Sequence, residues 1–418
     1  MPLFTSLHRL LGWAPGPITD ELINAAIESH LAETDDLDWK GELPPTKALN
    51  ETDFPKDVAA MANSGGGVIV YGIEEGEKRA TGRKDTGRLT ERHESTLRNA
   101  AVAAITPPVF GLGIVEVGME GNRVVAVVVP ASSDSPHLIF QNHYFGAPVR
   151  NDADTVWMKE RQIEASYRAR LDERRHSAEA LTNLYDEAVA NWTSSDRAWL
   201  VAVAKPQLPS TASERPTRDA AREIFEEASK NTLLYSGSGG IHPIESVEFL
   251  NPRPGLRRWV AANNALSDSR KWRESWMAVH HDGSVTLGTG VGGQRSRTVQ
   301  LEGHQIDSQS IETAVSDFMG LLRAASGRLG LGAYDVQVGI NWPGSTPLHV
   351  QDVDSRGSHF DDNATPLARY TPVARSVQAD AESLDFYWEV HDLAEDCVNQ
   401  GGVPEVSMIR PPSRKTEG

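Results

Sequence analysis

The sequence predicts an α+β protein with two domains. Its 418 residues exceed the usual size of one domain and leave room for two or three. Segments with helical spacing of apolar residues alternate with short β-branched runs, which is the mixture typical of α+β proteins. No pattern of the first part recurs in the second. We therefore predict a first domain over residues 1–175, a second α+β domain of unassigned type over 176–410, and a disordered tail over 411–418.

The composition describes an ordinary globular chain. Hydrophobic residues make up 39% and charged residues 24%. Cys397 is the only cysteine, which excludes a disulfide framework and a cysteine-based zinc site within one chain. The start, MPLFTSLHRLLGWAPG, lacks the pattern of a signal peptide, and the longest apolar runs are too short to cross a bilayer. We therefore expect a cytoplasmic protein.

Start and stop signals define the elements of the first domain. Thr19 suits a helix N-cap, with Asp20 and Glu21 in the first turn, and Pro55 suits the first turn of a later helix. The run Ser64–Gly67 ends that later helix and leads into VIVYGI, which reads as a buried central strand. The predicted elements are helices over 19–31, 52–63, 89–104 and 159–175, strands over 36–43 and 68–73, and a hairpin over 113–129.

The second domain shows fewer clear signals. AWLVAVA reads as a strand, and WMAVHHDGSVTLGTG reads as a hairpin with its turn at Asp282-Gly283. The remaining predictions are helices over 217–230 and 308–329, a strand over 334–340, and a long loop over 342–375.

The net charge of −17 opposes general binding to polyanions, because bulk repulsion hinders the approach of a phosphate backbone. Contact with a nucleic acid must therefore be local. One basic segment, residues 78–98, offers such a patch. Its cations are Lys78, Arg79, Arg83, Lys84, Arg88, Arg92 and Arg98. A solvated, mobile loop explains the same segment without any ligand.

Three familiar nucleotide and metal motifs are missing. No lysine follows a glycine, so there is no Walker A loop. HEST, beginning at His93, fails the HExxH pattern because position 97 is leucine. GTGVGG lacks the strand, turn and helix of a dinucleotide fingerprint.

Carboxylates around the first strand form a candidate site. Asp38, Lys40 and Glu42 share one strand face, because residues two apart do. Glu33 precedes them at the end of a helix, and Glu75 ends the strand VIVYGI. If the two strands are neighbours, Glu33, Asp38 and Glu75 converge and suit Mg²⁺ or Mn²⁺, with Lys40 near a substrate phosphate. An alternating strand with one wet face is the other explanation.

Three motifs follow one another within residues 18–170. The first is Glu33-x4-Asp38-Trp39-Lys40. The second is Ala62-Asn63-Ser64-Gly65-Gly66, followed by a strand that ends in Gly72-Ile73-Glu74-Glu75. The third is VPASSDSPH with Pro148-Val149-Arg150. Their order resembles the Schlafen-type AlbA-like domain, which has a mixed sheet. The chain departs from the family pattern in carrying Asp38 for glutamate, Trp39 for phenylalanine and Glu74-Glu75 for two aspartates.

The resemblance implies a function and a site. Eukaryotic Schlafen proteins use three acids in a metal-dependent endoribonuclease acting on tRNA and rRNA, and these acids fall on Glu33, Asp38 and Glu75. Lys40 joins them as a catalytic candidate. Bacterial members are described as DNA-binding modules of transcriptional regulators, sometimes as ATP-binding. Animal members carry two copies around a basic groove, so the single copy here implies a homodimer. Its groove would be lined by Lys78, Arg79, Arg83, Lys84, Arg88 and Arg150.

The sequence therefore supports two functional hypotheses. In the first, the protein binds nucleic acid and cleaves structured RNA with Mg²⁺ or Mn²⁺ held by the three acids. In the second, it is a non-catalytic regulator whose first domain binds DNA or a nucleotide and whose second domain senses a partner or small molecule.

Overall fold

The computed structural model divides the chain into two compact units, Met1–Arg175 and His176–Gly418. It describes residues 4–141, 144–192, 196–208, 215–237, 240–263, 273–294, 300–353, 359–360 and 365–412. Within these ranges no helix combines the length and the apolar character needed to span a bilayer. Most of the predicted tail, residues 413–418, lies outside the described residues.

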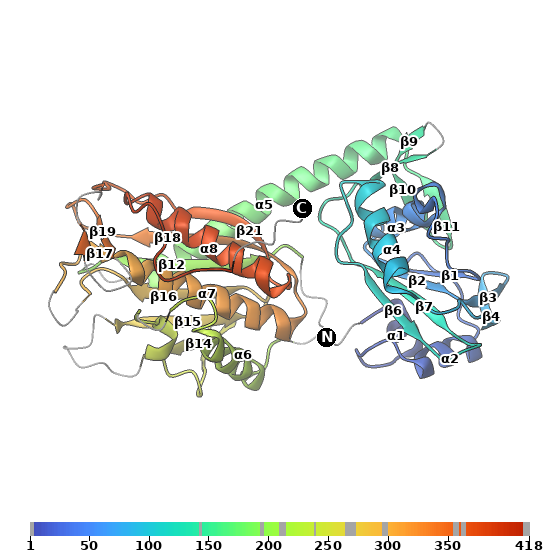
Figure 1. Ribbon diagram of the computed structural model, residues 1–418, viewed down its shortest axis with the longest axis horizontal. Coiled ribbons are helices and arrows are strands. Elements are labelled where there is room, and N and C mark those ends of the chain that lie inside the picture. Colours follow the sequence, from blue (N-terminus) through green and yellow to red (C-terminus); the bar gives the residue numbers. More distant parts are fainter. Residues whose placement is uncertain are drawn as a thin grey trace. The chain divides into compact units, whose positions relative to one another are not determined.

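Unit 1 consists of short strands and helices, labelled in Figure 1. Its helices are α1 (Ser6–Leu11), α2 (Asp20–Glu28), α3 (Phe54–Asn63) and α4 (Glu91–Ala103), with a 3-10 turn at Leu49–Glu51. Its strands are β1 (Leu37–Lys40), β2 (Gly67–Tyr71), β3 (Ile73–Gly76), β4 (Arg79–Arg83), β5 (Ile105–Thr106), β6 (Gly113–Val117), β7 (Val124–Val129), β8 (Leu138–Gln141), β9 (Tyr144–Gly146), β10 (Pro148–Asn151) and β11 (Asp154–Trp157). A long helix, α5 (Glu160–Trp192), begins in unit 1 and ends in unit 2.

A mixed four-stranded sheet of order β1-β2-β7-β6 forms the centre of unit 1. β1 and β2 run parallel, with Asp38 opposite Ile69, and the other pairs are antiparallel. Leu37 and Trp39 face a core shared with α1 and α2. Ile69 faces a second core shared with α3 and α4. The predicted mixed sheet is confirmed. β1 and β2 are neighbours, which is the arrangement that would bring Glu33, Asp38 and Glu75 together.

Local signals explain the two helices that flank β1. The Thr19 side chain accepts a hydrogen bond from the Leu22 N–H at 3.3 Å, which caps α2 as the sequence predicts. α3 begins next to Pro55 and ends where the chain turns sharply at Gly66, which has a φ of +93°. A Cβ at Gly66 would lie 2.7 Å from the Ala131 nitrogen, so only glycine permits this close turn.

Two local expectations for unit 1 were wrong. The polar face of β1 is not uniformly wet, because Asp38 is only 2% exposed, whereas the Lys40 side chain is 36% exposed. The basic segment is not simply a loop, because its strand β4 pairs with β3 as an antiparallel hairpin and helix α4 begins within it. Glu77 and Lys78 form its turn with φ values of 53° and 60°, the left-handed conformation that matches the twist of a two-residue hairpin.

Unit 2 is built on an antiparallel seven-stranded sheet of order β13-β14-β15-β16-β12-β18-β21. Its strands are β12 (Trp199–Pro206), β13 (Arg253–Gly255), β14 (Arg258–Ala262), β15 (Ser275–His280), β16 (Val285–Gly290), β17 (Gln305–Asp307), β18 (Ala333–Asn341), β19 (His349–Val353), β20 (His359–Phe360) and β21 (Val373–Gln378). Its helices are α6 (Arg218–Asn231), α7 (Ser308–Leu329) and α8 (Ser383–Asn399), with a 3-10 turn at Pro243–Ser246.

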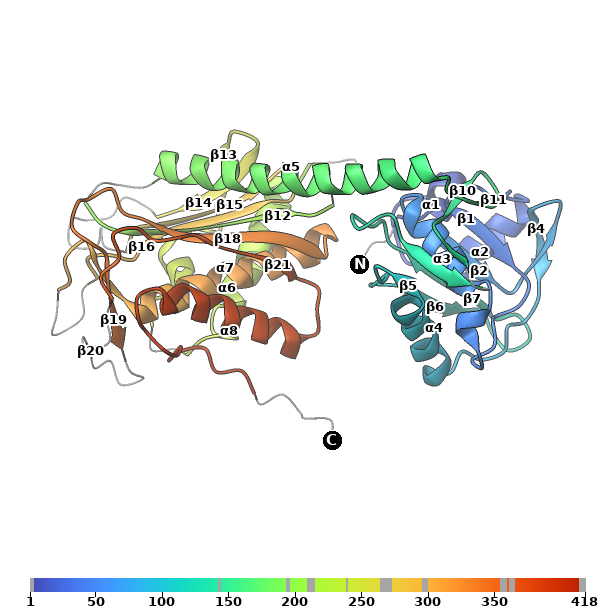
Figure 2. The same ribbon diagram turned by 90° about the horizontal axis from the view of Figure 1, so that it is seen from above.

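Helices cover both faces of this sheet, as Figure 2 shows. Phe225 of α6, Phe318 of α7 and Phe386 of α8 belong to the large core on one face. Leu181 and Tyr185, from the second half of α5, pack on the other face. The α+β class of the second domain is thus confirmed. The predicted loop over 342–375 was wrong, because β19 and the start of β21 lie within it.

Candidate functional site

Asp38 is the centre of a buried charge cluster in unit 1. Its Oδ2 lies 2.6 Å from the Lys40 ammonium, and its Oδ1 lies 3.2 Å from the Arg150 guanidinium. The side chains of Asp38 and Arg150 are 2% and 3% exposed, whereas that of Lys40 is 36% exposed. β1 supplies two of these residues and β10 the third. Lys40 is therefore the cation of this cluster that reaches solvent.

A second buried acid, Asp57 of α3, completes the cluster and was not predicted from the sequence. Its Oδ2 lies 3.9 Å from the Lys40 ammonium. Burial raises the pKa of Asp57 to about 6, against the opposing charge of Lys40 and with a contribution from Asp38. The sequence did contain a signal, because Asp57 is the only acid of the mostly apolar helix FPKDVAAMAN.

Asp38 and Asp57 also raise the pKa of Lys40. Burial lowers the pKa of this lysine, but the charges of Asp38 and Asp57 outweigh burial and hold its pKa above the ordinary value. Lys40 is therefore a fully charged ammonium at neutral pH, held between a strand and a helix.

Glu33 lies beside this cluster, as the sequence predicts. Its Oε1 accepts a hydrogen bond from the Trp39 N–H at 3.1 Å, so the carboxylate turns back over the start of β1. Burial raises the pKa of Glu33 to about 7, opposed by the Trp39 N–H, and the charges of Asp38 and Glu75 raise it further. The three acids named as metal ligands therefore interact electrostatically in the folded protein.

Glu75 is the exposed member of the predicted acid triad, on β3. Ligand oxygens of Glu33, Asp38 and Glu75 do not all lie within 4.8 Å of one another. A divalent cation would nevertheless suit the set, because three carboxylates supply the oxygen ligands that Mg²⁺ and Mn²⁺ prefer. Binding by all three would require their oxygens to approach one another more closely.

The Asn63 side chain positions Arg150. Asn63 Nδ2 donates hydrogen bonds to the carbonyls of His137 and Pro148 at 2.9 and 2.7 Å, and its Oδ1 accepts one from the His137 N–H at 2.7 Å. The next residue, Ser64, accepts the Arg150 N–H at 2.9 Å. The Ala-Asn-Ser-x-Gly-Gly motif thus fastens β10 to the end of α3 and directs Arg150 toward Asp38.

The predicted nucleic-acid-binding cations are largely paired with acids. Arg150 points into the Asp38 cluster rather than onto an exposed face. Three further cations form ion pairs: Lys78 with Asp154 at 2.6 Å, Arg83 with Asp20 at 2.7 Å, and Lys84 with Glu42 at 2.6 Å.

The remaining two cations of the predicted set differ in their contacts. Arg79 donates a hydrogen bond to the His30 carbonyl at 3.2 Å. Arg88 is exposed and has no charged partner among the described residues. The hairpin β3–β4 therefore carries much less free positive charge than its sequence implies.

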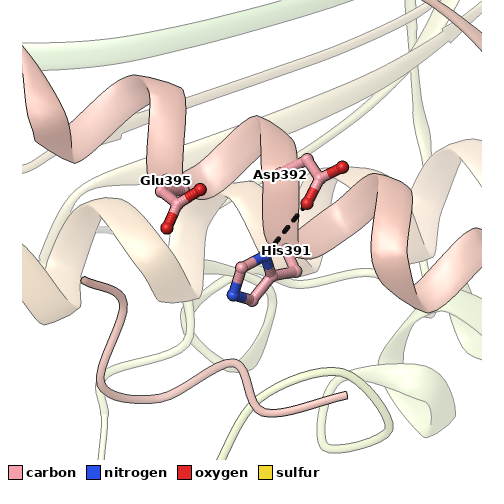
Figure 3. A group of neighbouring side chains, drawn as sticks. All are labelled: His391, Asp392 and Glu395. Atoms are coloured by element: carbon pink, nitrogen blue, oxygen red, sulfur yellow. Dashed lines mark hydrogen bonds and ion pairs between the residues drawn. The ribbon is translucent and has the colours of Figure 1, made fainter. Parts of the chain in front are cut away.

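One group of metal-ligand type occurs elsewhere in the described part of the chain, on α8. The ligand atoms of His391, Asp392 and Glu395 lie within 4.8 Å of one another. Figure 3 shows the three side chains projecting from the helix, with His391 Nδ1 donating a hydrogen bond to Asp392 at 3.1 Å. This bond already occupies one ring nitrogen of His391, and we assign no ion to the group.

Comparison with known proteins supports the resemblance of unit 1. Residues 33–159 match the family described as Schlafen, AlbA_2. This range contains all ten of the predicted site residues and also Asp57. No curated protein matches the chain.

Two solved structures show a partial likeness to the chain. The DIP2311 protein from Corynebacterium diphtheriae is 18% identical over 41% of this chain and 34% of its own, with a TM-score of 0.26. The N-terminal domain of a RecG-related protein from Nitrosomonas europaea is 16% identical over 35% of this chain and 89% of its own, with a TM-score of 0.23. The chain thus spans about a third of the length of the Corynebacterium protein.

Proposed function

We propose that the protein binds nucleic acid through unit 1 and cleaves structured RNA, such as tRNA, as a metal-dependent endoribonuclease. One observation carries the proposal: the Glu33 carboxylate accepts the Trp39 N–H at 3.1 Å and so turns back toward Asp38 at the start of β1. Burial raises the pKa of Glu33, and the charges of Asp38 and Glu75 add to this effect, so the three acids repel one another. A divalent cation relieves such repulsion. The Schlafen, AlbA_2 match over residues 33–159 supplies the nucleic-acid context.

In this function each residue has a distinct task. Glu33, Asp38 and Glu75 would hold Mg²⁺ or Mn²⁺, which would activate water and stabilise negative charge on the phosphate. Lys40, the solvent-reaching cation, neutralises charge that develops on the phosphate. Arg150 and the Trp39 N–H hold Asp38 and Glu33 in place. Arg88 and the cations of the β3–β4 hairpin contact the phosphate backbone nearby.

A cleavage assay tests the catalytic form. Wild-type protein is incubated with tRNA and with single-stranded DNA, with and without Mn²⁺, beside Asp38→Ala and Glu75→Gln. Glu75 is exposed, so its substitution removes a ligand without threatening the fold. We expect Mn²⁺-dependent cleavage of tRNA that both substitutions abolish. Cleavage that persists in both variants, or none in wild type, contradicts the nuclease.

A non-catalytic regulator is the second candidate, and one observation favours it. Both carboxylate oxygens of Asp38 are already ion-paired, with Lys40 and Arg150, and this arrangement needs no metal. Unit 1 would then bind DNA or a nucleotide, and unit 2 would sense a partner or small molecule. Salt-dependent affinity for DNA without cleavage in Mn²⁺ would identify this function.

We also propose a homodimer, because a single AlbA_2 region would form half of a two-sided groove. Arg88 and the hairpin cations would line that groove from both copies. Light scattering of the full chain tests this proposal, and a monomer at all concentrations contradicts it.

A further inference from the structure

Lys40 is held from two sides by carboxylates of different elements. Asp38 lies two residues away on the same strand, with its oxygen 2.6 Å from the ammonium. Asp57 lies on α3, with its oxygen 3.9 Å from the same ammonium. The Asp57 side chain is 7% exposed, so solvent screens this second contact weakly.

The charges of this cluster cancel. Asp57, Lys40, Asp38 and Arg150 alternate in sign along the chain of contacts Asp57–Lys40–Asp38–Arg150. Of the four side chains only that of Lys40, at 36%, has substantial exposure. A phosphate that approaches Lys40 therefore meets one accessible ammonium with two carboxylates behind it.

We propose that Asp57 is a positioning residue that restrains Lys40, tying its ammonium to α3 and limiting its attraction for nucleic-acid phosphate. This inference rests on the proposed nucleic-acid binding of unit 1, but it requires neither a metal nor cleavage. Asp57 lies outside the family pattern that named the other acids.

Removing the charge of Asp57 should tighten the binding of nucleic acid. Asp57→Asn keeps the size of the side chain and removes one negative charge near the ammonium, while Lys40 retains Asp38. The Lys40 ammonium then faces one carboxylate instead of two and attracts phosphate more strongly. We expect binding about 3- to 10-fold tighter, the range that one removed charge gives at an intermediate dielectric constant. Damage to the fold would weaken binding instead, so tightening separates restraint from a merely structural role.

The test is an anisotropy titration of the full chain with two labelled probes, a tRNA and a duplex DNA. The buffer contains EDTA at about pH 8, where the carboxyl groups are ionised. Asp57→Asn is measured in the wild-type chain and in the Lys40→Met background, with Lys40→Met alone as the reference for the second comparison. Glu164→Gln is the matched control, because it also removes one negative charge and releases a cation, Arg168, from a 2.6 Å ion pair on α5.

The affinities of the variants show whether Asp57 acts through Lys40. Tightening by Asp57→Asn that disappears in the Lys40→Met background, with less than about 2-fold change for Glu164→Gln, supports it. Unchanged or weaker binding by Asp57→Asn overturns it while leaving nucleic-acid binding intact, and so does tightening that persists without Lys40. If wild type binds neither probe, the proposed function fails and the inference fails with it.

Discussion

Asp38 and Arg150 form a buried ion pair at 3.2 Å although 112 residues separate them in the sequence. Arg150 also donates hydrogen bonds to the Thr34 carbonyl and to Thr155 Oγ1, so its guanidinium joins three segments of unit 1. This ion pair decides where the candidate site forms, because it fixes the central acid of the cluster.

Arg150→Gln should destabilise unit 1 by about 3 kcal/mol, because it leaves Asp38 buried with only Lys40 as a charged partner. Hydrogen exchange measured by mass spectrometry over peptides of β1 and β10 reports this local loss. Arg168→Gln, which breaks an exposed ion pair with Glu164, should change the same peptides by less than about 0.5 kcal/mol. Equal losses of protection for the two substitutions would show that the buried Asp38–Arg150 pair stabilises unit 1 no more than an exposed ion pair does.

Asn63→Ala should cost about 2–4 kcal/mol, because it leaves the buried carbonyls of His137 and Pro148 without their donor. It should also loosen Arg150 from Asp38. A double-mutant cycle with Arg150→Gln measures this link, and we expect a coupling of about 1 kcal/mol or more. Additive losses would mean that the motif does not position Arg150. Asn24→Ala, at an exposed hydrogen bond to Asp20, is the control.

Glu33→Gln should stabilise unit 1 at high pH and not at low pH. The pKa of Glu33 is about 7 in the folded state, above its ordinary value of 4.5, so the folded state binds more protons between these values. Stability therefore falls as pH rises through this window, and the full penalty applies above it. Glutamine keeps the acceptor for the Trp39 N–H without the charge. We expect a gain of about 2 kcal/mol near pH 8.

Thermal unfolding of the full chain in EDTA, near pH 4.5 and near pH 8, measures this difference. The transition of unit 1 is identified as the one that Arg150→Gln lowers. A gain of equal size at both pH values would show that the charge of Glu33 is not the cause.

His280 should make unit 2 sensitive to acid. Burial lowers the pKa of this histidine to about 4, against the charge of Asp282, so the unfolded state binds more protons between pH 4 and the ordinary value of 6.5. Stability is therefore complete above the ordinary value and is lost as pH falls toward the folded one, by about 3 kcal/mol in all. His280→Gln should flatten this dependence in urea titrations followed through the transition of unit 2. If wild type and variant lose the same stability as pH falls, groups other than His280 cause the loss.

The order of the site residues was readable from the sequence. The motif order and the family resemblance named Glu33, Asp38 and Glu75 together. The predicted helix end at Glu33 and strand end at Glu75 were wrong, because α2 ends at Glu28 and Glu75 lies on β3 rather than at the end of β2. The hairpin β6–β7 and the helix Ser308–Leu329 were also predicted, because apolar periods of two and 3.6 residues are properties of the local chain. α8 was missed although Phe386, Val390 and Leu393 carry the same helical period.

The sequence by itself determined that Asp38 and Lys40 lie on one face of β1 and Leu37 and Trp39 on the other, because the strand period fixes the face of each side chain. Only the tertiary structure decided that Asp38 is buried, that Arg150 pairs with it, and that Asp57 of α3 joins Lys40. The physical reason is that the free energy of a buried charge depends on partners brought together by packing. Those partners come from helices and strands distant in sequence, and no local period records them.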